Sequence, residues 1–183
     1  MKKRFFMPKR LDIKNIAQWL DDLKVGEEIL LSGTVYTARD AVHKKLTQML
    51  DNNEPLPIDL NGAAIYYAGP TPAKEGLAVG SCGPTTSSRM DPYTPRFLEL
   101  GLKCMIGKGE RSDEVVSSIV KNKALYLCAL GGAGALASKA IKSCVVVAFS
   151  ELGCESLKKM TVEDFPLIVA INCRGDNVFK RNG

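Results

Sequence analysis

Two adjacent threonines and an arginine stand in a stretch whose composition is that of a loop, "GSCGPTTSSRMD" at residues 80–91. Glycine, proline and serine favour turns here, but a plain connection needs no such polar set. Thr85 and Thr86 offer hydroxyl groups, and Arg89 offers a planar guanidinium that matches the geometry of a carboxylate. These residue types and their spacing predict a loop that binds a small carboxylic acid.

Two further cations stand directly after expected strands. Arg39, in "TVYTARDAVH", lies where a strand passes into a helix, so backbone amides and the guanidinium can face the same anion. Lys108 stands between two glycines in "MIGKGERSDE", where it can project into a cleft as a point charge. The alternatives are an ordinary surface arginine and a solvated turn lysine. The phosphate-loop pattern GxxxxGK[ST] is absent.

The chain's single histidine, His43, follows Arg39 by one helical turn and is expected on roughly the same face. It is either part of the site or a histidine at the boundary of the core. The loop "GPTPAKEG" at residues 69–76 is expected to be a plain turn. The glycines of "GGAGALASKAIK" at residues 131–142 resemble a phosphate-binding loop, but GxGxxG is not matched, so close packing of a helix is the preferred explanation.

The cysteines favour a structural role. There are six, no pair is closer than ten residues, and no CxxC motif suggests zinc or a redox dithiol. Cys82 is better explained as a small residue than as a nucleophile or cluster ligand. Four others lie in or beside apolar runs and are expected to be buried: Cys104, Cys128, Cys144 and Cys173. No metal site is expected within this chain.

The elements that position these side chains follow from hydrophobic periodicity. Strands are expected at residues 27–37, 62–69, 104–107, 124–130, 144–149 and 166–172. Helices are expected at residues 13–23, 39–50, 94–100, 112–122 and 135–142, with Thr94 and Ser112 as N-caps. Alternating strands and helices predict an α/β fold with some parallel pairing, and ligands of such sheets bind beyond the carboxyl ends of the strands.

Length and charge set the remaining limits. The 183 residues are expected to form one domain, with residues 1–10 a flexible N-terminal extension. A net charge of +5 without a recognised motif argues against nucleic acid as a partner. The longest apolar run, 144–149, is too short to cross a membrane. With no signal peptide recognised, reduced thiols and a cytoplasmic location are expected.

Five stretches then resemble a known family in their order and spacing: "GTVYTARDAVHKKL", "YYAGPTPAK", "GSCGPTTSSRMD", "MIGKG" and "GGAGALASKAIK". The chain is similar to the beta subunit, or C-terminal domain, of class I iron–sulfur fumarate hydratases and the related L(+)-tartrate dehydratases. The similarity covers residues 25–179. The combination of "GPTTSSRMD" with "TARDAVH" is specific, whereas either motif alone is weak.

The resemblance implies a swivelling β/β/α fold with layered helices and a mixed sheet. It implies a hydro-lyase that interconverts fumarate and L-malate, or dehydrates tartrate, and a [4Fe–4S] cluster held by three cysteines of a partner alpha subunit. Alpha-beta pairs that dimerise are the expected assembly. The roles carried over are substrate binding for Arg39, Thr86 and Arg89, and catalysis for Thr85 and Lys108. A non-catalytic anion-binding module of the same fold is the competing class.

Overall fold

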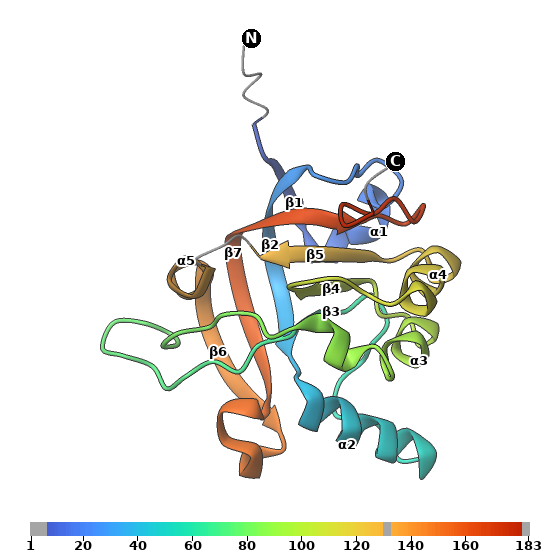
Figure 1. Cartoon of the computed structure of the whole chain (residues 1–183). Helices are drawn as coiled ribbons and strands as arrows, with labels where there is room; N and C mark the ends of the chain where they lie inside the picture. Colours follow the sequence, from blue (N-terminus) through green and yellow to red (C-terminus); the bar gives the residue numbers. More distant parts are fainter. Residues whose placement is uncertain (1–6, 130–132, 181–183) are drawn as a thin grey trace.

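The computed structural model describes residues 7–129 and 133–180. Seven strands form one sheet in the order β1-β2-β3-β4-β5-β7-β6 (Figure 1). The first five strands are parallel to their neighbours, and β7 runs antiparallel to β2, β5 and β6. The strands are β1 (Lys9–Asp12), β2 (Glu28–Thr37), β3 (Ala64–Tyr66), β4 (Cys104–Gly107), β5 (Leu125–Ala129), β6 (Ile141–Ala148) and β7 (Leu157–Ile171).

Strand β7 closes the sheet on itself. Its residue Ile168 pairs with Glu28 of β2 on one side and with Cys128 of β5 on the other. Strands β2, β3, β4, β5 and β7 therefore form a closed circuit of pairings, and β6 extends from β7 as an edge strand. The parallel run places the carboxyl ends of β2, β3 and β4 side by side, because their register aligns Thr37 with Tyr66 and Tyr66 with Ile106.

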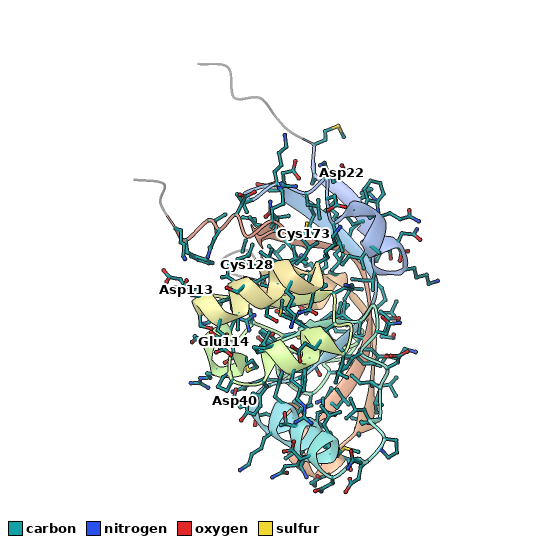
Figure 2. The ribbon with its side chains drawn as sticks, turned by 90° about the vertical axis from the view of Figure 1, so that its right-hand side faces the viewer. Asp22, Asp40, Asp113, Glu114, Cys128 and Cys173 are labelled. Atoms are coloured by element: carbon teal, nitrogen blue, oxygen red, sulfur yellow. The ribbon has the colours of Figure 1, made fainter. Side chains whose placement is uncertain are left out.

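Helices cover the sheet on both faces. They are α1 (Ile16–Trp19), α2 (Asp40–Asp51), α3 (Thr94–Glu99), α4 (Asp113–Asn122) and α5 (Ala133–Ala140), with 3-10 turns η1 (Ile13–Asn15), η2 (Ser87–Met90) and η3 (Ser150–Glu155). Figure 2 shows α2, α3 and α4 stacked in one layer, with Asp40 and Asp113, which begin α2 and α4, toward the same edge. That edge receives the ends of the parallel strands.

The alternation of side chains along the strands builds two cores. Ala64 and Tyr66 of β3 belong to a cluster that includes residues of α1 and α5, whereas Ile65 belongs to a second cluster with residues of α2, α3 and α4. In α2 the side chains of Val42 and Leu46 are fully buried. Each such side chain contributes about 2 kcal/mol of transfer free energy, so α2 and the residues that precede it are held firmly against the sheet.

The expected α/β architecture with a mixed sheet is confirmed. The N-cap prediction is right for Ser112, whose hydroxyl accepts a hydrogen bond from the Val115 amide at the start of α4. It is wrong for Thr94. Tyr93 takes the cap position of α3, and the Thr94 hydroxyl is buried, where it donates to the Met90 carbonyl at 2.8 Å. The cap is lost because Thr94 is already helical and its side chain serves tertiary contacts.

Several boundaries differ from the sequence predictions, and three of them have a clear physical reason. Lys9 and Arg10, expected in a flexible extension, belong to β1, because they pair with Ile29 and Leu30 at the edge of β2. Strand β7 begins at residue 157, nine residues before the predicted strand, since Met160 and Val162 alternate inward between exposed polar residues. Residues 141 and 142, expected in a helix, open β6 because they lie beside β7.

Candidate active site

The ends of three adjacent strands bring the expected site residues together. The Ala38 amide donates to the Tyr66 carbonyl at 3.1 Å, and the Tyr67 amide donates to the Ile106 carbonyl at 2.9 Å. The backbone just after β2, β3 and β4 is thus joined at one edge of the sheet. Arg39 follows the first of these strands, and Lys108 follows the third.

The loop at residues 80–91, called the threonine loop below, is hydrogen-bonded both to the end of β3 and to the loop around Lys108, called the lysine loop. The Thr85 amide donates to the Tyr67 carbonyl at 2.7 Å, and Thr86 pairs with Lys108 as an isolated parallel bridge. The Ser87 amide donates to the Lys108 carbonyl at 2.9 Å, and the Lys108 amide donates to the Ser87 hydroxyl at 3.0 Å. This reciprocal pair fixes Thr85 and Thr86 beside Lys108.

Gly107 makes that approach possible. A Cβ at this position would collide with the Ser87 hydroxyl and stand 2.9 Å from the Tyr67 ring. The glycine before Lys108 is therefore required by a close contact of backbone with the threonine loop. The Lys108 side chain itself is exposed, as a solvated lysine or a residue waiting for a ligand would be.

Arg39 stands at the N-terminus of α2 with its side chain crossing the glycine loop after β3. Its Cδ lies 3.4 Å from the position of a Cβ on Gly69, so a side chain there would press on it. One guanidinium nitrogen lies 3.0 Å from Glu155 Oε1. The buried Arg39 Nε has no hydrogen-bond partner among the described residues. Arg39 is therefore oriented by protein contacts and still has a donor to offer.

Arg89 completes the group from the 3-10 turn η2. Its Nη1 lies 3.7 Å from Asp40 Oδ2, next to Arg39 in the chain, and its side chain is 56% exposed. All five expected residues thus come to one edge of the sheet: Arg39, Thr85, Thr86, Arg89 and Lys108. Arg39 and Arg89 are paired there with Glu155 and Asp40, and Lys108 is exposed, so three cationic side chains lie at the edge where an anion could bind. Their individual roles stay predictions.

His43 belongs neither to the exposed part of the site nor to the boundary of the core. Its ring is fully buried, stacks on Phe97 with centroids 5.1 Å apart, and meets Tyr67 edge-on at 5.5 Å. Nδ1 lies 2.9 Å from the Arg39 carbonyl. Burial among rings lowers the pKa of His43 to about 4, so the ring is neutral at pH 7. A neutral ring with no route to solvent supports the turn that carries Arg39.

Two acidic partners of the arginines were missed by the sequence analysis. Asp40 stands in the quoted "TARDAVH" but has no pattern that pairs it with Arg89. Glu155 comes from η3, far from Arg39 in the chain, and no local periodicity marks it. Only a correct placement of β6 and β7, which flank η3, could have brought Glu155 to the site.

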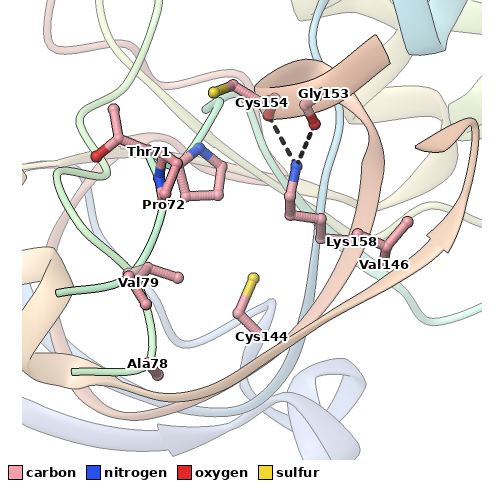
Figure 3. A pocket seen from close by; sticks show the side chains of 11 residues that line it. Thr71, Pro72, Ala78, Val79, Cys144, Val146, Gly153, Cys154 and Lys158 are labelled. Atoms are coloured by element: carbon pink, nitrogen blue, oxygen red, sulfur yellow. Dashed lines mark hydrogen bonds between the residues drawn. The ribbon is translucent and has the colours of Figure 1, made fainter. Parts of the chain in front are cut away.

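A cavity of about 210 Å³ lies behind the Glu155 turn (Figure 3). None of the five expected residues lines it. The Lys158 ammonium at its wall donates to the carbonyls of Gly153 and Cys154 at 3.0 and 2.9 Å and to the Ser156 hydroxyl at 2.7 Å. Burial lowers the pKa of Lys158. These contacts occupy its three donors, so Lys158 braces the turn that presents Glu155.

Comparison with known protein families shows to which family the chain belongs. The model of the family described as "Fumarase C-terminus" matches residues 3–182. The chain belongs to this family. Fumarate hydratase 2 of Leishmania major is 40% identical over 171 residues, which are 92% of this chain and 30% of the relative. The aerobic class I fumarate hydratase of Escherichia coli K12 is 39% identical, over 92% of this chain and 31% of the relative.

A second kind of relative has nearly the length of this chain. The L(+)-tartrate dehydratase subunit beta of Escherichia coli K12 is 39% identical over 171 residues, covering 91% of this chain and 84% of the relative. The chain thus spans about a third of the fumarate hydratases that it matches and most of a separate subunit. The relatives are enzymes that add or remove water, so the Fumarase C-terminus family is one of hydro-lyases.

The cysteines of this family member do not fit an iron–sulfur cluster. Among residues 7–129 and 133–180, no three side chains of histidine, cysteine, aspartate or glutamate gather where they could hold a metal ion. Cys82, Cys104 and Cys173 are buried, whereas Cys154 is exposed. Burial raises the pKa of Cys82 to about 12, which disfavours a thiolate at neutral pH.

The structure also bears on the expected burial of the cysteines, on the glycines at residues 131–134 and on membrane-spanning helices. Cys128 and Cys144 are half-buried, not fully buried as predicted. Gly131 and Gly132 lie outside the described residues, but a Cβ on Gly134 would stand 3.0 Å from the Ser81 hydroxyl, so close packing against the threonine loop explains this glycine. No helix within the described part of the chain is long and apolar enough to cross a membrane.

Proposed function

We propose that this chain is the beta-type half of an iron–sulfur hydro-lyase that interconverts fumarate and L-malate. It supplies the residues that bind the dicarboxylate and transfer a proton, and an alpha-type chain supplies the [4Fe–4S] cluster. The observation that carries the proposal is the convergence of Arg39, Arg89 and Lys108 on one edge of the sheet beside two threonine hydroxyls.

The charges suit a C4 dicarboxylate. Such a substrate carries two carboxylates, and during addition or loss of water a further negative charge develops on the carboxylate next to the carbanionic carbon. Arginine forks hold a carboxylate in a fixed orientation, and a lysine adds a point charge. Donors already placed where charge develops stabilise the transition state more than the ground state. Arg39, which is braced by Glu155, meets this requirement best.

Thr85 is the proposed proton-transfer residue. Its backbone is held at 2.7 Å from the Tyr67 carbonyl and its side chain is half-buried, so the hydroxyl is better fixed than that of the exposed Thr86. A threonine hydroxyl is a poor base by itself. An acidic group of the alpha-type chain is proposed to activate it, and Thr86 is proposed to hydrogen-bond the substrate.

The cluster is assigned to the alpha-type chain because the residues of this chain do not fit it. An open iron site there supplies Lewis-acid chemistry when it is present. The residues described above bind and orient the substrate and exchange its proton. The proposed assembly is an alpha-beta pair that dimerises in the cytoplasm. Relatives that are a separate beta subunit support the two-chain arrangement.

The two-chain proposal is tested on the purified chain. Anaerobic incubation with iron and sulfide is expected to leave it colourless and without hydratase activity. The same treatment of a mixture with the alpha-type chain is expected to give a brown, active complex. A brown and active single chain would contradict the division of the site between two chains.

L(+)-tartrate dehydration is the second candidate, favoured by the similarity to tartrate dehydratase beta subunits, each 39% identical and covered to 84% of its length. Rates of the reconstituted pair on fumarate, L-malate and tartrate, measured side by side, decide between them. In the same assay Arg39→Ala, Arg89→Ala and Thr85→Ala are each expected to lower kcat/KM. An unchanged value for any one removes that residue from the site.

A non-catalytic anion-binding module makes a different prediction. It would have no neighbouring gene for a chain with cluster-binding cysteines, and no such chain would co-purify. The convergence of all five residues supports the enzyme instead. Detection of the alpha-type chain in a pull-down with the tagged protein, together with activity of the pair, separates the two possibilities.

A further inference from the structure

A buried arginine lies directly beneath the two loops of the proposed site. Arg111 follows Lys108 by three residues, and its guanidinium is completely shielded from solvent. Burying a charged group is costly unless it is paired and hydrogen-bonded. The partners of the Arg111 guanidinium therefore indicate its structural role.

The guanidinium joins its own segment, which follows Lys108, to the segment that follows Arg89. Its Nε donates to Asp91 Oδ1 at 2.6 Å, and Nη2 donates to the Thr94 hydroxyl at 2.8 Å. Both partners belong to the chain segment that follows Arg89. The other oxygen of Asp91 accepts from the Ser112 amide at 2.7 Å, next to Arg111. Three hydrogen bonds thus join the two segments.

Aromatic rings set the position of the guanidinium between the loops. Its central carbon lies 5.3 Å from the centre of the Tyr67 ring and 5.0 Å from that of Tyr126, at cation–π distance. Tyr67 follows β3 and Tyr126 belongs to β5, so the two rings fix the position of the guanidinium relative to the sheet. A lysine could keep the charge here but could not reproduce the planar fork.

A second set of contacts joins the same loops at their near ends. The Tyr126 hydroxyl lies 2.8 Å from the Gly109 carbonyl and 2.9 Å from the Ser87 hydroxyl. A carbonyl only accepts, so the tyrosine proton goes to Gly109, and the Ser87 hydroxyl can donate to Tyr126 while it accepts from the Lys108 amide. The loops are fastened at Ser87 on one side of Arg89 and at Asp91 on the other.

We propose that Arg111 is a positioning residue that fixes the spacing between the Thr85–Arg89 loop and Lys108. This inference rests on the proposed function of that site. Stability alone is a weak explanation of the ion pair, because a buried pair adds little over apolar side chains of similar volume. A fork that ties the two segments to each other and lies against rings of the sheet accounts for the contacts of the guanidinium.

The kinetic test is a double-mutant cycle in the reconstituted complex, with fumarate, L-malate and tartrate as the probes. Arg111→Lys alone is expected to lower kcat/KM about 10- to 100-fold, because small misplacements of site residues have effects of this size. In a Lys108→Ala background the same change is expected to cost less than about 3-fold, since the residue that it positions is gone. Additive losses would overturn the proposal.

The second readout does not depend on activity. Hydrogen exchange of the Ser87 and Lys108 amides is expected to accelerate in Arg111→Lys, while exchange in β4 stays unchanged. Unchanged exchange at both loop amides would also overturn the proposal. Arg96→Lys is the matched control, because Arg96 pairs with Asp51 on the surface and is expected to alter neither readout.

The same experiments separate this inference from the proposed function. If Arg111→Lys does not fold, Asp91→Asn is expected to show the same coupling to Lys108→Ala and the same faster exchange, because it removes the charge that Arg111 holds. A wild-type complex that is inactive on all three substrates contradicts the proposed function. An active wild-type complex with additive variants contradicts only the positioning role of Arg111.

Discussion

Arg39 and Glu155 form an ion pair of 3.0 Å between the start of α2 and the turn after β6. The pair joins two segments that are distant in the chain and holds the guanidinium over the glycine loop. Both side chains are partly exposed, at 27% and 36%, so the pair contributes at most about 1 kcal/mol. Its value lies in orienting Arg39 rather than in stability.

Glu155→Gln is therefore expected to lower kcat/KM for the dicarboxylate roughly 2- to 5-fold, because the fold-change cannot exceed the small energy of the pair. Steady-state kinetics of the reconstituted complex checks this. Glu151→Gln is the matched control on the same turn, since Glu151 pairs with Lys45. Equal effects of the two substitutions would refute the specific role of Glu155.

Gly107→Ala is expected to destabilise the protein by about 1–3 kcal/mol, because the new methyl group collides with the Ser87 hydroxyl and presses on the Tyr67 ring. The measurement is urea unfolding followed by circular dichroism. Gly83→Ala is the control in the threonine loop, where a Cβ meets nothing within 4 Å, and its stability is expected to stay within about 0.5 kcal/mol of the wild type.

His43 makes stability depend on pH. Its pKa is about 4 in the folded protein and 6.5 when exposed, so the unfolded chain takes up the proton first. Burial is the main cause, Arg111 also lowers the pKa, and the Arg39 carbonyl and Asp40 oppose the shift. The free energy of unfolding is therefore highest above pH 6.5, and this effect lowers it by roughly 3 kcal/mol as the pH falls toward 4.

Unfolding free energies measured between pH 4 and pH 7 test this, with the imidazole signal in NMR reporting the protonation of His43. Because the chain has one histidine, the signal has a single origin. The variant His43→Phe is expected to show a flatter profile over this range. A His43 signal that titrates near pH 6.5 in the folded protein would contradict the burial of the ring.

The thiols are expected to react in the order of their exposure. Cys154 is exposed and should be alkylated first by iodoacetamide at pH 7. The Cys82 thiol, with a pKa of about 12, is a thiolate in only about one molecule in 10⁵ and is buried as well. Mass spectrometry of the native protein should find Cys82 unmodified until urea unfolds it. Early modification of Cys82 would restore it as a candidate nucleophile.

The sequence by itself determined the class of the fold, the cap of α4 and the five polar residues that follow strands. These depend on local rules: side-chain periodicity, capping chemistry, and the polar residues that gather at the carboxyl ends of parallel strands. The threonine loop around Thr85 and the glycine-flanked Lys108 could be singled out because their composition departs from that of a core or a plain turn.

Only the tertiary structure decided which residues support that set. The insertion of β7 between β2 and β5 brings Glu155 to Arg39, and the packing of α2 on α3 buries His43. The Arg111–Asp91 pair forms because two loops leave neighbouring strands. Each of these contacts joins residues far apart in the chain, and no local pattern encodes such a distance. A metal-binding group is likewise a matter of tertiary structure, and among residues 7–129 and 133–180 no three suitable ligands meet in space.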